Sequence, residues 1–194
     1  NLLFYTDGVT VWNRNHEVME GGERLLGSFS ATQSALVIPK PGSTSEYYVF
    51  TSDAKQSYSP TGNESNGINY SVIDMNAQGG LGAVTQKNIN LLPQGSEKLT
   101  AVKATNQVDY WLVTHYRDAF YSFKVSLAGV SNSPVVTTIG PLISDYNNIR
   151  GAIKLSPFGN KLAVAHTQFE PIFGGKLRLY DFDIDTGIVS NEQN

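Results

Sequence analysis

Three carboxylates near the end of the chain could bind a metal ion. Asp181, Asp183 and Asp185 alternate with other residues before Gly187. Calcium loops place oxygen ligands at their first, third and fifth positions, so this spacing makes a weak Ca²⁺ site one hypothesis. Thr186, however, stands at the sixth position, where such loops carry Gly. The alternative is a tight turn after a strand, in which Asp185 caps the turn and Gly187 takes a positive φ.

Two histidines occupy matching positions in the sequence. His115 and His166 each end a run of strand-forming residues, and could contact a ligand or partner there. A metal site would need a third ligand, which the spacing does not identify. Their shared position is also expected if neighbouring repeats keep one residue for the same hydrogen bond. His16 is expected to be a solvated loop residue.

Residues for covalent or acid–base catalysis are harder to find by spacing. The chain has no Gly-x-Ser-x-Gly elbow, and Gly79-Gly80-Leu81-Gly82 lacks the Lys-Ser/Thr of a phosphate loop. A glycosidase draws its two carboxylates from distant loops and leaves no spacing pattern, so acidic residues beside turns stay open candidates. These are Asp53, Asp74, Asp109, Asp118 and Asp145. Tyr58, Tyr116 and Arg117 are assigned to loops between strands, as contacts for a protein or glycan ligand.

The elements that would position these residues are short strands in repeated order. Segments beginning at Ala35, Ala101 and Ala152 each contain four strand-like runs separated by turns, with an insertion rich in Ser, Asn and Gly at 54–67. Four strands in about 50 residues are typical of propeller blades. We therefore predict an all-β fold, a β-propeller of about four four-stranded blades that forms part of a larger, seven-bladed ring. The expected blades are 1–30, 31–95, 96–145 and 146–194. A closed four-bladed ring and a β-sandwich are the alternatives.

The composition limits the classes of partner that the chain could bind. Only 16% of residues are charged and the net charge is −3, which argues against nucleic acid. No apolar run approaches the ~20 residues of a membrane span. Cys is absent, which removes disulfides and thiolate sites. The chain opens in strand-like sequence, so we expect it to belong to a longer polypeptide whose remaining blades or domains cover its open faces.

The chain also resembles a known group of proteins. The stretches that carry the resemblance are Leu3-Phe4-Tyr5-Thr6-Asp7-Gly8-Val9-Thr10-Val11-Trp12, Thr32-Gln33-Ser34-Ala35 with Pro39-Lys40-Pro41-Gly42, and Leu155-Ser156-Pro157-Phe158-Gly159-Asn160-Lys161-Leu162-Ala163. Together they are similar to the WD-like propeller region of large Bacteroidota surface proteins, which often carry PKD or Ig-like repeats and are associated with gliding motility and type IX secretion. The resemblance implies a secreted or cell-surface location and supplies no catalytic residue.

These observations favour a module that binds rather than reacts. The sequence predicts a non-catalytic propeller of a secreted bacterial protein, acting in binding, adhesion or scaffolding, without a required cofactor. The alternative is an extracellular carbohydrate-active propeller enzyme that uses acidic loop residues. A purely structural part of a larger assembly is a third hypothesis.

Overall fold

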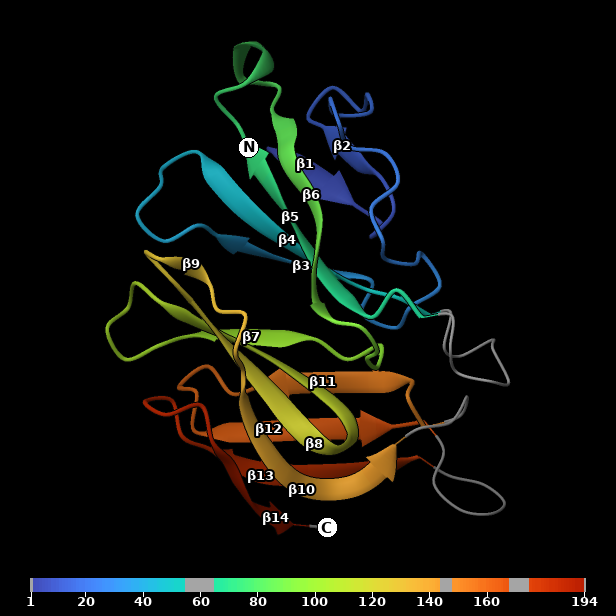
Figure 1. Ribbon diagram of the computed structural model, residues 1–194, viewed down its shortest axis with the longest axis vertical. Helices are drawn as coiled ribbons and strands as arrows, with labels where there is room; N and C mark the ends of the chain where they lie inside the picture. Colours follow the sequence, from blue (N-terminus) through green and yellow to red (C-terminus); the bar gives the residue numbers. More distant parts are fainter. Residues whose placement is uncertain (1, 55–64, 144–147, 168–174, 194) are drawn as a thin grey trace.

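The protein consists of antiparallel β-sheets, as the alternating pattern predicts. A computed structural model describes residues 2–54, 65–143, 148–167 and 175–193, which form four separate sheets (Figure 1). A short 3₁₀ helix, η2 (Gln78–Gly80), interrupts the chain between two strands. Within these residues no helix is long and apolar enough to cross a membrane. The all-β class is therefore confirmed.

The first sheet is a two-stranded hairpin. β1 (Phe4–Thr6) pairs with β2 (Val11–Asn13) through a turn at Asp7 and Gly8. The Asp7 carboxylate accepts hydrogen bonds from the backbone amides of Val9 and Thr10, both at 2.8 Å. Gly8 has φ +89°, and a Cβ there would lie 2.8 Å from the Ser34 carbonyl oxygen. Only glycine therefore allows this turn to approach the next sheet.

The second sheet is a four-stranded meander. Its strands, in both spatial and chain order, are β3 (Ala35–Pro39), β4 (Glu46–Ser52), β5 (Ile68–Asp74) and β6 (Ala83–Leu92). Lys40 and Glu46 form an ion pair of 2.8 Å across the turn between β3 and β4.

The third sheet contains the longest strand. β8 (Tyr110–Ser126) runs for 17 residues and lies between β7 (Thr100–Lys103) and β10 (Val135–Ile143). Its first part pairs with β7 and its later part with β10, while its end pairs with the two-residue strand β9 (Gly129–Val130). One continuous strand thus replaces the two separate strands that the sequence predicted at 110–115 and 120–125.

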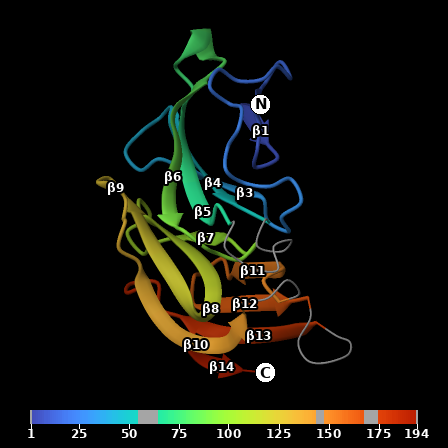
Figure 2. The same ribbon diagram turned by 45° about the vertical axis from the view of Figure 1, so that its right-hand side comes forward.

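The fourth sheet repeats the meander order. It consists of β11 (Gly151–Leu155), β12 (Lys161–His166), β13 (Lys176–Phe182) and β14 (Val189–Gln193). Figure 2 shows this sheet behind the long strands β8 and β10. Burial alternates strictly along β11, so one face is covered and the other is open.

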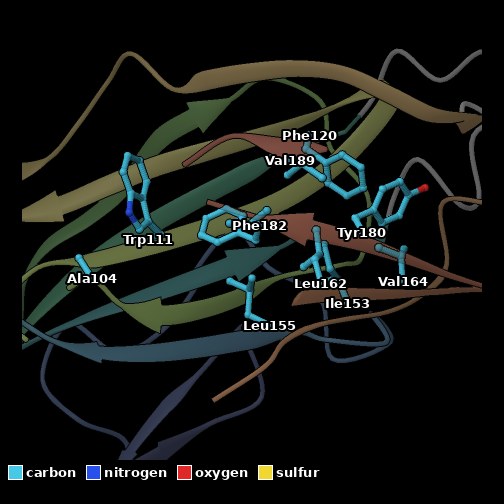
Figure 3. Packing of buried hydrophobic residues seen from close by; sticks show 11 residues of the cluster. Ala104, Trp111, Phe120, Ile153, Leu155, Leu162, Val164, Tyr180, Phe182 and Val189 are labelled. Carbon is cyan, nitrogen blue, oxygen red and sulfur yellow. The ribbon is translucent and has the colours of Figure 1, made fainter. Parts of the chain in front are cut away.

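Apolar side chains fill the spaces between consecutive sheets in three clusters. Val11 and Val49 belong to the first cluster, and Phe50 and Phe123 to the second. The third joins the last two sheets, where Trp111 and Phe120 of β8 face residues of β11–β14 (Figure 3). Burying a large side chain of this kind contributes about 2 to 3 kcal/mol, so these contacts hold the stack together.

The predicted β-propeller is wrong. Each of the last three sheets has four strands, but the sheets are separate, and the described residues close neither a ring nor a barrel. The N-terminal segment supplies a two-stranded sheet rather than most of a blade. Strand periodicity reports how each sheet folds locally, whereas closure depends on the rotation between sheets and their number. The repeat therefore could not establish a ring.

Candidate functional site

Ionisable side chains gather where the third and fourth sheets meet. Five of them are almost fully buried: Glu97, Lys98, His115, His166 and Tyr180, each at most 2% exposed. Lysine, glutamate and histidine are rarely buried completely without a specific reason. Such groups with perturbed pKa values mark candidate functional sites.

Lys98 lies just before β7 and supplies a buried cation. Its Nζ donates hydrogen bonds to the carbonyl oxygens of Asn148 (2.9 Å) and Ile149 (2.8 Å). Burial lowers the pKa of this amine to about 7, although the negative charge of Glu97 opposes the shift. Near neutral pH the amine can therefore gain or lose a proton.

Glu97 and Gln33 fix the segments around Lys98. One carboxylate oxygen of Glu97 accepts hydrogen bonds from the Thr32 amide (2.7 Å) and hydroxyl (2.8 Å). The side chain of Gln33 joins β7 to β11: its Nε2 donates to the Leu99 carbonyl (2.8 Å), and its Oε1 accepts from the Ile153 amide (3.0 Å). Residues before β3 thus hold the inner strands of the next two sheets in place.

His115 lies inside β8 with no exposed surface. Its ring stacks on Phe120, with centroids 4.3 Å apart and an interplanar angle of 16°. Neither ring nitrogen has a hydrogen-bond partner among the described residues. Burial lowers the pKa of His115 well below 6.5, and the neighbouring His166, Lys98 and Arg178 lower it further. The imidazole is therefore neutral at pH 7.

His166 ends β12 and lies edge-on to His115. The two ring centroids are 5.6 Å apart at an angle of 70°. Burial, followed by the charges of Lys98 and Arg178, lowers the pKa of His166 to about 3. Arg178 on β13 forms an ion pair with Glu192 on β14. Two neutral imidazoles thus lie in the positive field of a lysine and an arginine.

Tyr180 and Gly140 form the side of the cluster next to His115. Tyr180 packs edge-on to Phe120 at 4.9 Å, and Figure 3 shows its hydroxyl at the outer end of the apolar cluster. Burial raises the pKa of this phenol to about 12, so it stays protonated at neutral pH. A Cβ on Gly140 would lie 2.9 Å from the Tyr180 hydroxyl and 3.5 Å from Nε2 of His115. A larger residue at 140 would crowd both polar groups.

The arrangement combines the groups needed for hydrolysis of an ester. A neutral imidazole can accept a proton from water, and a cation can stabilise the negative charge that forms on a carbonyl oxygen. A buried polar atom without a partner is uncommon, and His115 has two. The cluster is therefore a candidate site, with each of its five ionisable side chains at most 2% exposed.

Of the predicted calcium residues, Asp183 and Asp185 belong to the turn after β13, whereas Asp181 lies within that strand. Asp183 accepts hydrogen bonds from the Asp185 and Thr186 amides, and Gly187 has φ +78°. Asp181 binds Lys161 at 2.5 Å and Asn191 at 2.8 Å, while the Thr105 hydroxyl donates to Asp185 at 2.7 Å. Among described residues, no group of three His, Cys, Asp or Glu side chains could hold a metal ion.

The structure brings two of the predicted ligand contacts together and places the other described ones elsewhere. His115 and His166 come together, as described above. Tyr116 and Arg117 lie within β8 rather than in a loop; Tyr116 is buried, with its hydroxyl 3.0 Å from Oε1 of Gln94, and Arg117 is exposed. Tyr58 lies outside the described residues.

Sequence reasoning missed Lys98 and Gln33. Both lie just before strands, where polar residues are ordinarily solvated, and nothing in their spacing indicates burial. The one available signal was the polar run Ser96-Glu97-Lys98 directly ahead of an apolar strand. Its burial depends on segments far away in the sequence, namely residues 32–33 and 148–149.

Comparison with known proteins gives a fold and no family. No model of a protein family and no curated protein matches the chain. A crystal structure described as a "putative 6-phosphogluconolactonase" from Bacteroides uniformis ATCC 8492 is similar, with a TM-score of 0.53 at 11% sequence identity. The similarity covers 98% of this chain and 56% of that one, so this chain spans about half of that protein's length. At this identity the likeness concerns the fold.

These findings correct the predicted function. A non-catalytic propeller module for binding, adhesion or scaffolding is not supported, because the described residues form separate sheets and no propeller, and the similar structure is described as a "putative" enzyme. The predicted role in adhesion loses its support with it. The Bacteroidota surface-protein resemblance and the cell-surface location remain predictions, as does the Ca²⁺ ion.

Proposed function

We propose that the chain contributes to a hydrolase that opens the lactone of a sugar acid. The observation that carries the proposal is the pair of neutral, buried imidazoles beside Lys98 and Arg178. The likeness to a structure described as a "putative 6-phosphogluconolactonase" supports the choice of a lactone, and a phosphorylated one, as the substrate class.

The reaction balances with the groups of this cluster. A histidine takes a proton from water as the oxygen of that water bonds to the lactone carbonyl carbon. Lys98 or Arg178 stabilises the resulting oxyanion. The bond from the carbonyl carbon to the ring oxygen then breaks, and the ring oxygen receives the proton. The product is a hydroxy acid, and the histidine returns to its neutral form.

A negatively charged substrate would strengthen the base. The pKa of His166 is about 3 partly because Lys98 and Arg178 are positive. A phosphate or a forming oxyanion near these cations cancels part of their field, which raises the histidine pKa toward its ordinary range. A base is most effective when its pKa lies near the working pH, so anion binding and catalysis reinforce each other.

Lactone hydrolysis by the purified chain tests the proposal. Acid release from 6-phosphogluconolactone is followed at constant pH and compared with the uncatalysed rate. We expect His115→Gln and His166→Gln to lower kcat at least tenfold, while His16→Gln, at an exposed turn, leaves it unchanged. Thermal unfolding of each variant shows that it is folded. No turnover above the uncatalysed rate, or equal turnover in all variants, would overturn the proposal.

A further inference from the structure

Asn66 and Gly67, just before β5, form the one Asn-Gly pair of the sequence. The fold requires glycine at 67, because its φ is +68° and a Cβ there would lie 1.9 Å from the Leu92 carbonyl oxygen. Without a side chain, nothing shields the Gly67 nitrogen from the side-chain carbonyl carbon of the residue before it. An unshielded backbone amide therefore follows Asn66 directly.

The backbone carbonyl of Asn66 accepts hydrogen bonds from two side-chain amides. Nδ2 of Asn69 donates to this oxygen at 2.7 Å, and Nδ2 of Asn90 donates to it at 3.2 Å. Asn69 is 1% exposed, and its Oδ1 also accepts from Nδ2 of Asn90 at 3.1 Å. The carbonyl shares a peptide bond with the Gly67 nitrogen. When that nitrogen loses its proton, negative charge spreads to the carbonyl oxygen, where the two amides stabilise it.

Backbone contacts hold the pair at the edge of the sheet. The Asn66 amide donates to Oδ2 of Asp53 at 2.7 Å, and the Asp53 amide donates to the Gly67 carbonyl at 3.2 Å. The Gly67 amide donates to the Ser65 hydroxyl at 2.9 Å, and β5 begins only at Ile68. A reaction at the Gly67 nitrogen therefore breaks a contact with a side chain and none of the ladder.

We propose that Asn66 converts to isoaspartate without an enzyme, and that the side-chain amides of Asn69 and Asn90 promote the reaction. The Gly67 nitrogen gives its proton to hydroxide and bonds to Cγ of Asn66. The bond from Cγ to Nδ2 breaks, and Nδ2 takes a proton from water and leaves as ammonia. The product is a succinimide ring, and the hydroxide is regenerated.

The same two amides direct the opening of the ring. They polarise the former backbone carbonyl of residue 66, so water adds to that carbon in preference to Cγ. The bond from this carbon to the Gly67 nitrogen then breaks, and the nitrogen regains a proton. The main chain now runs through Cγ, which makes the residue isoaspartate. Gly67 and Ile68 are buried, so the added backbone atom should destabilise the start of β5.

Mass spectrometry of the purified chain after incubation at pH 8 tests the conversion. Replacing the amide by an acid raises the mass of the peptide that contains residue 66 by about 1 Da, and fragmentation distinguishes isoaspartate from aspartate. Asn132 provides an internal comparison. The Ser133 amide donates to the Ser131 hydroxyl at 3.2 Å, much as Gly67 does to Ser65, but among the described residues no side-chain amide donates to the Asn132 carbonyl. We expect isoaspartate at 66 and an unchanged residue at 132.

Substitution of the two amides tests their role. Asn69→Ala and Asn90→Ala should each slow the conversion at least threefold in the folded chain, and neither should change it in urea, where the contacts are lost. Asn132→Ala, the matched control, should keep the parent rate. Thermal unfolding before incubation shows which variants fold, and Asn90→Ala, at an exposed position, decides if Asn69→Ala does not fold. An unmodified Asn66, or equal rates in the parent and Asn90→Ala, would overturn the proposal.

Discussion

The imidazole rings of His115 and His166 meet edge to face inside the protein, with centroids 5.6 Å apart. They come from neighbouring sheets, on β8 and β12, and both pKa values lie below 6.5. Two buried histidines with lowered pKa values in one cluster link the stability of the fold to pH.

Acidification should destabilise the protein through these histidines. Below pH 6.5 the unfolded chain binds protons that the folded chain, with a His166 pKa of about 3, does not bind. Stability is therefore greatest above pH 6.5 and falls as the pH decreases. From pH 7 to pH 5 we expect a loss of up to about 2 kcal/mol per buried histidine. Urea unfolding at both pH values measures it. His166→Gln should reduce the loss, and His16→Gln should not.

Lys98 should make the protein more stable as the pH rises from 7 to 9. Its folded pKa of about 7 lies below the ordinary value of 10.5, so the unfolded chain holds more protons in this range. The linkage predicts a gain of about 2 kcal/mol. Urea unfolding of the parent and of Lys98→Met at both pH values tests this. An equal gain in the variant would assign the effect to other groups.

Gln33 should stabilise the stack through its amide. Gln33→Ala leaves the Leu99 carbonyl and the Ile153 amide without this partner, at a cost of about 2 to 3 kcal/mol. Gln33→Glu keeps an acceptor for the Ile153 amide but places a carboxylate oxygen against the Leu99 carbonyl oxygen, so a loss at least as large is expected. Chemical denaturation ranks the variants. Gln86→Ala, at an exposed strand position, is the control.

Gly187 should tolerate no side chain, because of Trp111. Gly187 and Gly79 both have positive φ, but a Cβ at Gly187 would lie 2.8 Å from the indole, whereas at Gly79 nothing lies within 4 Å. Alanine at either position costs about 1 kcal/mol of backbone strain. Gly187→Ala should cost about 1 to 3 kcal/mol more from overpacking. Thermal unfolding compares the pair, and equal losses would contradict the packing argument.

The sequence predicted what local pattern determines. Alternating residues such as Ile153 and Leu155, and the turn at Asp183 and Gly187, follow from strand periodicity and turn chemistry. The adjacency of the last two repeats placed His115 and His166 within reach of each other. The continuous strand through Tyr116 and Arg117 was missed, because those polar residues read as a loop.

The rest depends on contacts between distant segments. Lys98 is buried because its amine reaches two carbonyls some 50 residues away, and no local pattern signals that. The predicted propeller was wrong for a similar reason. The angle between sheets is set by side chains such as Trp111 at their interfaces. The periodicity of the strands does not encode how these side chains pack.

The central claim is that the cluster of His115, His166 and Lys98 receives an anion. The most direct measurement is an NMR pH titration of the histidine rings with and without 6-phosphogluconate, the acid that lactone hydrolysis would release. We predict that the pKa of His166 rises from about 3 by at least one unit in its presence. Identical titration curves for both buried rings with and without the acid would contradict the account.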